Sequence, residues 1–341
     1  MKNLDTSTKA ILCMILTCFF GLAFFTPAGC FGAEGAQSTR PVRDDLLSVS
    51  FPTGTDGWVS GRWGVVIHTS DGGKTWTPQK TGTDFTLSSI YFIDNKHGWA
   101  VGDEGTIIST SNGGKDWQAQ KSPVPFFLMD VCFATPLKGW IVTERTHILH
   151  TEDGGKTWEI QFKEDDFILK SIAFSDERNG WAVGEYGFIY HTKDGGKTWK
   201  QESGFFRFSE RTGESEGGNQ LFSVTALDEM KAWAAGIEGT LTMTVDGGKN
   251  WKTLKTPLTK KPFYGMAGSK NGAIAVAGKT SFFVSEDGGA TWKAAQLDPP
   301  FPYGWIYGIT TRGQSGFAAV GQQGTIYISE TGKPYAWRRV N

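Results

Sequence analysis

Short apolar stretches alternate along this chain with turns rich in Gly, Asp and Asn. Gly98-Trp99-Ala100-Val101-Gly102 shows the pattern, and the same residues return at Gly180-Trp181-Ala182-Val183-Gly184. Short runs of β-branched and aromatic residues between turn residues are typical of β-strands. After the first 33 residues, no stretch has the spacing of an amphipathic helix. The pattern therefore predicts an all-β protein.

One turn recurs and sets the period of the chain. Asp71, Asn112, Asp153 and Asp194 each begin the sequence Asp/Asn-Gly-Gly-Lys-x-Trp, at intervals of 41 residues. Looser copies follow at 246–251 and 287–292, and a decayed copy at 331–337 brings the number to seven. A fixed period of this length is the signature of a repeat architecture.

Each repeat holds four strand-like segments. The first reads Leu-x-Ser-Ile/Val, as in Leu169-Lys170-Ser171-Ile172; the second carries Gly-Trp, the third Gly-Thr-Ile, and the fourth starts at the Trp after the turn. One sheet cannot bury both its faces, whereas a ring of packed sheets can. We therefore predict a seven-bladed β-propeller of four-stranded antiparallel blades over residues 46–341. The first repeat begins on an inner strand and the last ends on an outer one, so nothing indicates closure by a swapped strand.

The recurring turn itself is interpreted as scaffold. Its Asp can accept hydrogen bonds from backbone N–H groups, its two Gly residues permit positive φ, and its Trp can pack between blades. One carboxylate per turn is too few for Ca²⁺, which binds six or more oxygens. His68, His150 and His191 fall at equivalent third-strand positions, which indicates packing. We expect no metal and no cofactor.

The first 33 residues are expected to be an export signal. Lys2 and Lys9 precede the apolar stretch 10–25, and small residues follow, which is the order found in signal peptides. Pro27-Ala28-Gly29-Cys30 is similar to a bacterial lipoprotein box, although Pro27 stands where Leu is usual. Two outcomes stay open: lipidation of Cys30, which would tether the protein to a membrane surface, or simple cleavage nearby. A short polar lead follows at 34–45. In both cases we expect an exported protein, periplasmic or tethered on the outer side of the cytoplasmic membrane.

Composition narrows the functional classes further. The formal net charge is −1, so nothing predicts nucleic-acid binding. Three of the four Cys lie before residue 31, and the remaining Cys132 sits in an apolar segment, where it is interpreted as a core residue. We expect the folded part to be a monomer.

One interval breaks the period. Asp194 and Asp246 are 52 residues apart, and the excess falls at 201–220, a polar, Gly-rich segment with aromatic and basic residues near its start. Because strands alternate in direction, this insertion shares a face with the second-to-third turns and the blade-to-blade connections. Arginine and aromatic residues favour protein contacts. The candidate partner-binding residues on this face are Arg62, Arg145, Tyr186, Arg207 and Arg211.

Two other interpretations of this face stay open. Long loops on a rigid scaffold often carry function, but the insertion can also be a tolerated surface segment. Phe85, Phe126 and Phe167 occur at identical register in three connections. They would either contribute to the partner-binding face or pack as core at the mouth of the central channel.

The motifs resemble a known family. Ser/Thr-x-Asp-Gly-Gly-x-Thr-Trp is similar to the Asp-box (BNR) repeat of sialidases and sortilin-type receptors. Combined with Gly-Trp-Ala-Val-Gly and Gly-Thr-Ile at 41-residue spacing, it resembles the photosystem II stability/assembly factors of cyanobacteria and chloroplasts, over residues 44–341. The resemblance implies a non-enzymatic propeller that binds the precursor of a reaction-centre subunit through an arginine-bearing surface. Arg62 and Arg145, in corresponding turns, are the candidates for that surface.

We therefore expect a protein that is not an enzyme and that binds a membrane-protein subunit or its exposed segment, aiding its assembly or stability. The alternative is a sialidase-like glycan-active or glycan-binding propeller. Sialidases combine a three-arginine clamp with a Tyr nucleophile, and their Arg-Ile-Pro signature is absent from this sequence. Carboxyl pairs such as Asp103-Glu104 and Asp165-Asp166 are interpreted as exposed turns, which favours the binding role.

Overall fold

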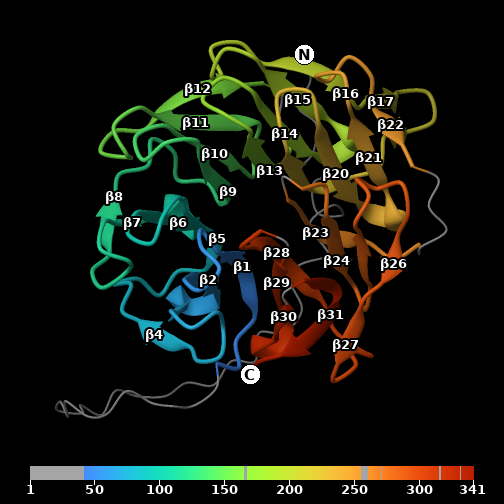
Figure 1. Ribbon diagram of the computed structural model, residues 1–341. Coiled ribbons are helices and arrows are strands. Elements are labelled where there is room, and N and C mark those ends of the chain that lie inside the picture. Colours follow the sequence, from blue (N-terminus) through green and yellow to red (C-terminus); the bar gives the residue numbers. More distant parts are fainter. Residues whose placement is uncertain (1–41, 165–166, 255–259, 270, 315, 331) are drawn as a thin grey trace, which may run out of the picture. The chain divides into compact units, whose positions relative to one another are not determined.

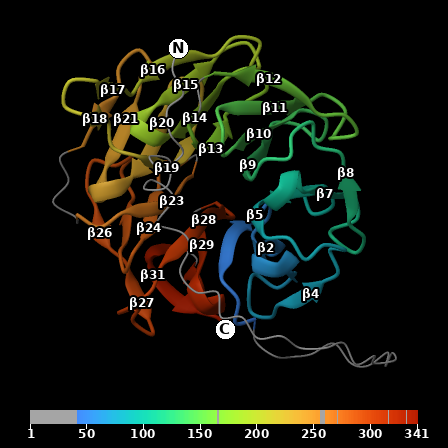
Figure 2. The ribbon, with the colours of Figure 1, turned by 180° about the vertical axis from the view of Figure 1, so that it is seen from behind.

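The computed structural model describes residues 42–164, 167–254, 260–269, 271–314, 316–330 and 332–341. Its antiparallel sheets follow one another around a ring, in chain order, as Figures 1 and 2 show from opposite sides. The predicted all-β, seven-bladed propeller of four-stranded blades is confirmed. The leader at 1–33, with Cys30, lies outside the described residues, as does residue range 34–41 of the polar lead.

The strands of each blade run in chain order from the inside of the ring to its outer edge. Blade 1 consists of β1 (Leu46–Ser50), β2 (Gly57–Gly61), β3 (Val66–Thr69) and β4 (Thr77–Gln79). Blade 2 consists of β5 (Leu87–Phe92), β6 (Gly98–Gly102), β7 (Ile107–Thr110) and β8 (Gln118–Gln120). Blade 3 consists of β9 (Leu128–Phe133), β10 (Gly139–Thr143), β11 (His147–Thr151) and β12 (Glu159–Lys163).

The remaining blades repeat this order. Blade 4 consists of β13 (Leu169–Phe174), β14 (Gly180–Gly184), β15 (Ile189–Thr192) and β16 (Lys200–Ser203). Blade 5 consists of β19 (Leu221–Ala226), β20 (Ala232–Gly236), β21 (Leu241–Thr244) and β22 (Lys252–Thr253). Blade 6 consists of β23 (Phe263–Gly268), β24 (Ile274–Gly278), β25 (Phe282–Ser285) and β26 (Lys293–Ala294). Blade 7 consists of β28 (Ile306–Arg312), β29 (Gly316–Gly321), β30 (Ile326–Glu330) and β31 (Lys333–Arg339), and β27 (Gln296–Asp298) joins its edge parallel to β31.

In the described residues, the helical segments are single 3₁₀ turns between the second and third strands. They are η2 (Arg62–Gly64), η3 (Asp103–Gly105), η4 (Glu185–Gly187), η5 (Ile237–Gly239) and η6 (Gln322–Gly324). Within the described ranges, no helix has the length and apolar character needed to cross a membrane.

The insertion is more ordered than its polar sequence suggested. Its first residues continue β16, and most of the rest forms a separate hairpin of β17 (Phe206–Ser209) and β18 (Glu214–Gly217). Alternation of Phe206, Arg207 and Phe208 was a weak strand signal that the surrounding Gly, Ser and Glu residues obscured.

Aromatic residues pack between blades, as the Gly-Trp pattern predicts. Trp99 of β6 stacks on Phe133 of the next blade, with ring centroids 3.5 Å apart, and Trp158 meets the same ring edge-on at 5.9 Å. Gly139 begins the second strand of the same blade as Phe133, and a Cβ on it would collide with the Phe133 ring. This Gly therefore leaves room for the ring on which Trp99 of the preceding blade stacks. The same arrangement recurs at Trp58–Phe92 and Trp140–Phe174.

The Asp-Gly-Gly turns have the scaffold role expected of them. Thr157 donates to Asp153 through its N–H (2.9 Å) and through its hydroxyl (2.7 Å), and Gly155 N–H donates to the Thr151 hydroxyl at 2.8 Å. Gly154 and Gly155 have φ of 75° and 87°, which a side chain would disfavour. This turn therefore closes on itself through its own side chains, and equivalent bonds form in the turns that begin at Asp71, Asp194, Asp246 and Asp287.

The ring closes without exchanging a strand. The apolar side chains of blades 1 and 7 form one shared cluster, which includes Val49 and Val320, and β1 lies beside β28 in both views (Figures 1 and 2). Arg312 of blade 7 donates to the Gly54 carbonyl at 3.1 Å, and Gln323 N–H donates to the Asp45 carboxylate at 3.0 Å.

Candidate partner-binding face and central channel

The second-to-third turns and the blade-to-blade connections lie together on one face, here called the connection face. In successive blades the first residue of the turn donates its N–H to a carbonyl of the connection: Arg62 to Asp45 (3.1 Å), Asp103 to Thr86 (3.0 Å) and Glu144 to Phe127 (2.9 Å). This placement follows the predicted alternation of strand directions. The Asp-Gly-Gly turns lie on the opposite face.

Arg62 and Arg145 lie in corresponding second-to-third turns, as expected, but one residue apart within the turn. Arg62 directly follows β2, whereas Arg145 is the second residue after β10 and corresponds to Trp63. Arg62 Nε lies 3.3 Å from Asp45 Oδ2, and the Arg145 guanidinium lies over the Phe126 ring at 4.7 Å. The two arginines belong to blades 1 and 3, so they do not form one cluster.

Tyr186 lies beneath the β17–β18 hairpin and anchors it. Its ring is 4.6 Å from that of Phe206, measured between centroids, and 5.5 Å from that of Phe167. Phe205 N–H donates to the Tyr186 carbonyl at 3.3 Å. Burial, followed by the charge of Glu185, raises the pKa of Tyr186. Tyr186 is half-buried and its ring packs on that of Phe206, so it positions the hairpin.

Arg207 and Arg211 are the arginines that the hairpin presents to solvent. The Arg207 guanidinium lies over its neighbour Phe205 at 5.6 Å, and within the described part of the chain neither arginine forms an ion pair. Phe208, on the same strand, is 60% exposed. Arg207 and Phe208 are successive strand residues and point to opposite faces of the hairpin. The ring beside the Arg207 guanidinium is therefore that of Phe205, which is 42% exposed.

Exposed aromatic residues gather on the connection face. Trp63 is 70% exposed and Tyr303 is 86% exposed, and Phe85 is also exposed there. Exposed apolar residues of the opposite face are aliphatic: Leu137, Met230 and Val245. Aromatic residues and arginines are the side chains that dominate the energetics of protein interfaces, so the connection face is the candidate partner-binding surface.

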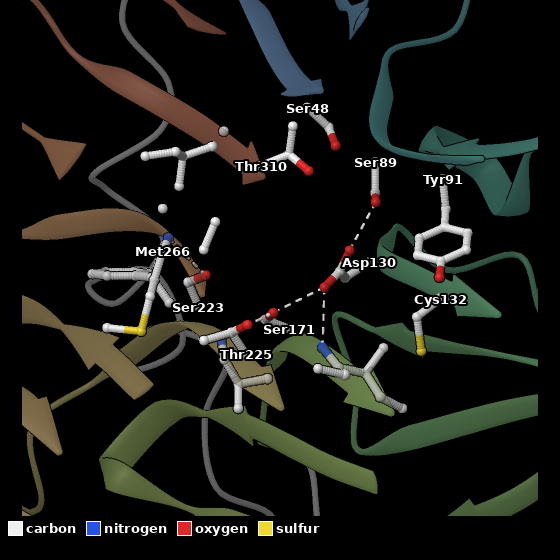
Figure 3. Close-up of a pocket in the computed structure, with 18 of the residues that line it drawn as sticks. Ser48, Ser89, Tyr91, Asp130, Cys132, Ser171, Ser223, Thr225, Met266 and Thr310 are labelled. Carbon is white, nitrogen blue, oxygen red and sulfur yellow. Dashed lines mark hydrogen bonds between the residues drawn. The ribbon is translucent and has the colours of Figure 1, made fainter. Parts of the chain in front are cut away.

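The inner strands enclose a channel of about 340 Å³. Figure 3 shows Asp130 in its wall, where Ser89 and Ser171 donate their hydroxyls to its carboxylate at 2.7 and 2.9 Å. Ile172 N–H donates to the same group at 3.0 Å. Burial in the wall raises the pKa of Asp130 and outweighs these hydrogen bonds, which lower it.

The channel does not hold the residues that a glycoside hydrolase uses. Among the described residues that line it, Asp130 is the one acidic side chain and there is no arginine. Hydrolases of this kind need two carboxyl groups across the bond to be broken. The described residues also contain no group of three His, Cys, Asp or Glu side chains placed to hold a metal ion. Phe85, Phe126 and Phe167 do not line the channel. Phe126 and Phe167 pack against core clusters of the blades, as one of the two interpretations expected, whereas Phe85 is exposed.

Fold and connection face together define a seven-bladed Asp-box propeller with a surface suited to binding protein. The family model described as "Photosynthesis system II assembly factor YCF48" matches residues 76–126, 115–204 and 214–339. The chain belongs to this family, as the motifs indicated. A comparison with curated proteins gives no match.

Solved structures share the fold at low sequence identity. "YCF48 bound to D1 peptide" is 23% identical, with a TM-score of 0.67 over 84% of this chain and 93% of that one. "YCF48 from Cyanidioschyzon merolae" is 20% identical, with a TM-score of 0.69 over 87% and 99%. The GH74 enzyme of Niastella koreensis is 13% identical, with a TM-score of 0.68 over 87% of this chain and 54% of that one.

Proposed function

We propose that this chain is a non-enzymatic binding protein that holds an exposed segment of a membrane-protein subunit and aids its assembly or stability. Membership of the assembly-factor family supports this function, and a solved member of that family is described as bound to a D1 peptide. The segment would lie on the connection face, against the β17–β18 hairpin.

The unpaired arginines of the hairpin are the observation that carries the proposal. Arg207 lies over the Phe205 ring, which is 42% exposed, and Arg211 is exposed in the turn that follows β17. An acidic and apolar segment would therefore find both charge and apolar contact there. Guanidinium groups bind carboxylates in a two-pronged geometry that lysines cannot reproduce. The hairpin is fixed to blade 4 through Tyr186, which limits the entropy lost on binding.

The test is capture from detergent-solubilised membranes of the source cells, with the captured membrane proteins quantified. The double change Arg207→Glu and Arg211→Glu should lower recovery of the specific partner about tenfold or more, the effect of losing an interface hot spot. Arg178→Glu is the matched control, because Arg178 is exposed on the opposite face. If the unmodified protein, the double variant and Arg178→Glu all recover the partner equally, the hairpin does not take part in the proposed binding.

We also propose that the protein is exported, on the strength of the charged start and apolar stretch of residues 1–33. Cell fractionation of the full chain should place it outside the cytoplasm. Cys30→Ala should release it from membranes if Cys30 is lipidated and leave its distribution unchanged if the leader is simply cleaved. Recovery of the unprocessed chain in the cytoplasm would contradict export.

A further inference from the structure

One position in each inner strand forms the mouth of the channel at the connection face. It is the second residue of the strand, the variable residue of the Leu-x-Ser pattern. In blades 1 to 3 this position is uncharged, with Leu47, Ser88 and Met129. In blades 4 to 7 it holds Lys170, Phe222, Tyr264 and Tyr307. These seven positions therefore include one cation, Lys170, and a run of aromatic residues beside it.

Lys170 has no carboxylate in direct contact among the described residues, although Glu185 is near enough for its charge to act on it. It is half-buried and forms no ion pair with a described residue. Burial lowers its pKa, and the charge of Glu185 opposes that effect. The Glu185 carboxylate accepts a hydrogen bond from Ile168 N–H at 3.1 Å instead of contacting Lys170. A cation that has lost part of its hydration without gaining a partner favours an incoming anion.

The aromatic wall is continuous across blades 5 to 7. The Phe222 ring is 5.1 Å from that of Tyr264, and the Tyr264 ring is 6.4 Å from that of Tyr307, measured between centroids. Trp305 extends the wall outward, 6.1 Å from Tyr307. Burial raises the pKa of Tyr307 to about 12, so its hydroxyl stays protonated and can donate a hydrogen bond.

The described residues of the deeper wall include one carboxyl group, that of Asp130, and burial raises its pKa, which favours its uncharged form and weakens its repulsion of an anion. Both oxygens of Asp130 accept hydrogen bonds from serine hydroxyls and backbone N–H groups. Serine and threonine hydroxyls, such as those of Ser48 and Thr310, make up much of the remaining wall (Figure 3). These groups can donate hydrogen bonds to a bound anion.

We propose that the channel mouth is a binding site for a carboxylate attached to an apolar group. The carboxylate lies against Lys170, and the apolar group packs on Phe222, Tyr264 and Tyr307. The channel volume of about 340 Å³ is at the small end of ligand pockets. A small organic acid and the free chain end of a peptide present the same chemistry. The site is separate from the hairpin and does not depend on the function proposed for it.

Isothermal titration calorimetry of the full chain tests the site with three probes. They are 3-phenylpropionate, acetyl-Ala-Phe with a free carboxylate, and the C-terminal amide of the same dipeptide. At least one acid should bind, and the amide should bind about tenfold more weakly or not at all, because it cannot form a charge-assisted contact. Binding by phenylpropionate alone identifies a small acid as the ligand class, and binding by the dipeptide acid identifies a chain end.

Two variants assign the binding to Lys170. Lys170→Met should weaken binding of the acid about tenfold or more, while Lys252→Met, on the exposed outer strand β22, should leave it unchanged. The Arg207→Glu, Arg211→Glu protein should bind the acid normally, which separates this site from the hairpin. The proposal is overturned if neither acid binds, if the amide binds as tightly as the acid, or if Lys170→Met binds like the unmodified protein.

Discussion

Asp130→Ser should make the stability of the propeller less dependent on pH. Blades 1, 2, 4 and 5 have a serine at this position, whose hydroxyl accepts a hydrogen bond from the next blade. Ile90 N–H donates to Ser48 at 3.2 Å and Met266 N–H donates to Ser223 at 3.1 Å. In blade 3, Asp130 accepts the equivalent bond from Ile172 N–H at 3.0 Å. A serine there can keep this bond without placing a carboxyl group in the channel wall.

The magnitude follows from the groups that lose a partner. In Asp130→Ala, Ile172 N–H would have no acceptor, and an unsatisfied buried donor costs about 1–3 kcal/mol. Val131 N–H would still have the Ser89 hydroxyl at 3.4 Å. We therefore expect Asp130→Ala to be about 1–3 kcal/mol less stable than Asp130→Ser.

The sign of the pH effect comes from the raised pKa of Asp130. Between the unfolded pKa, about 3.9, and the higher folded pKa, the folded state binds more protons, so its stability falls as pH rises. The serine variant lacks this loss, so its free energy of unfolding relative to the unmodified protein should increase above pH about 4. Burial raises the pKa of neighbouring Cys132 and Tyr91, so neither titrates in acid.

Urea unfolding of the unmodified protein, Asp130→Ser and Asp130→Ala from pH 4 to pH 8 measures both effects. Contributions from all other titrating groups are shared and cancel in the difference between proteins. A difference between Asp130→Ser and the unmodified protein that stays constant over this range would refute the assignment of a raised pKa. Equal stability of the serine and alanine variants would refute the role of the hydrogen bond to Ile172.

Three further predictions concern packing, the turns and the hairpin. Trp140 is fully buried and Trp63 is 70% exposed. Trp140→Ala should therefore lower the free energy of unfolding by about 3–5 kcal/mol, whereas Trp63→Ala should change it by less than about 0.5 kcal/mol. Equal urea midpoints for the two variants would contradict this prediction. Hydrogen bonds from Thr157 lower the pKa of Asp153 to about 2, so its contribution to stability is present above pH about 4 and is lost toward pH 2. Asp153→Asn should therefore lose less melting temperature on acidification than the unmodified protein, and an identical loss would count against it. A Cβ on Gly217 would collide with the ring beneath the hairpin, so Gly217→Ala should speed proteolytic cleavage between β17 and β18 while the melting temperature of the ring changes little.

The repeat pattern predicted the fold because each repeated residue has a local mechanical reason. Trp99 must stack on Phe133, and Gly139 must leave room for that stack. These requirements recur in successive blades, so they appear in the sequence as a period. Blade number, strand order and the face that carries the connections all follow from that period.

The proposed binding surfaces were harder to predict because their residues do not repeat. Lys170 occupies the x of Leu-x-Ser, which looked unconstrained because residues of several chemical types occur there. Lys170 lies beside the aromatic residues of blades 5 to 7 because the inner strands of the blades line one channel, and this proximity is not visible in the sequence. Arg62 and Arg145 lie in corresponding turns, but a shift of one residue gives their side chains different surroundings, which the sequence did not reveal. Tyr186 was correctly placed on the connection face, but its contact with Phe206 depends on a hairpin that the sequence did not specify.

The junction between blades 7 and 1 differs mechanically from the other six. At those six the polypeptide itself runs from one blade to the next, so a pulling force must stretch covalent chain. Between β28 and β1 the load is carried by side-chain packing and by contacts such as those of Arg312 with Gly54 and of Gln323 with Asp45. Under tension applied to residues 42 and 341, this junction should part first, and the blades should then peel away one after another from the two ends.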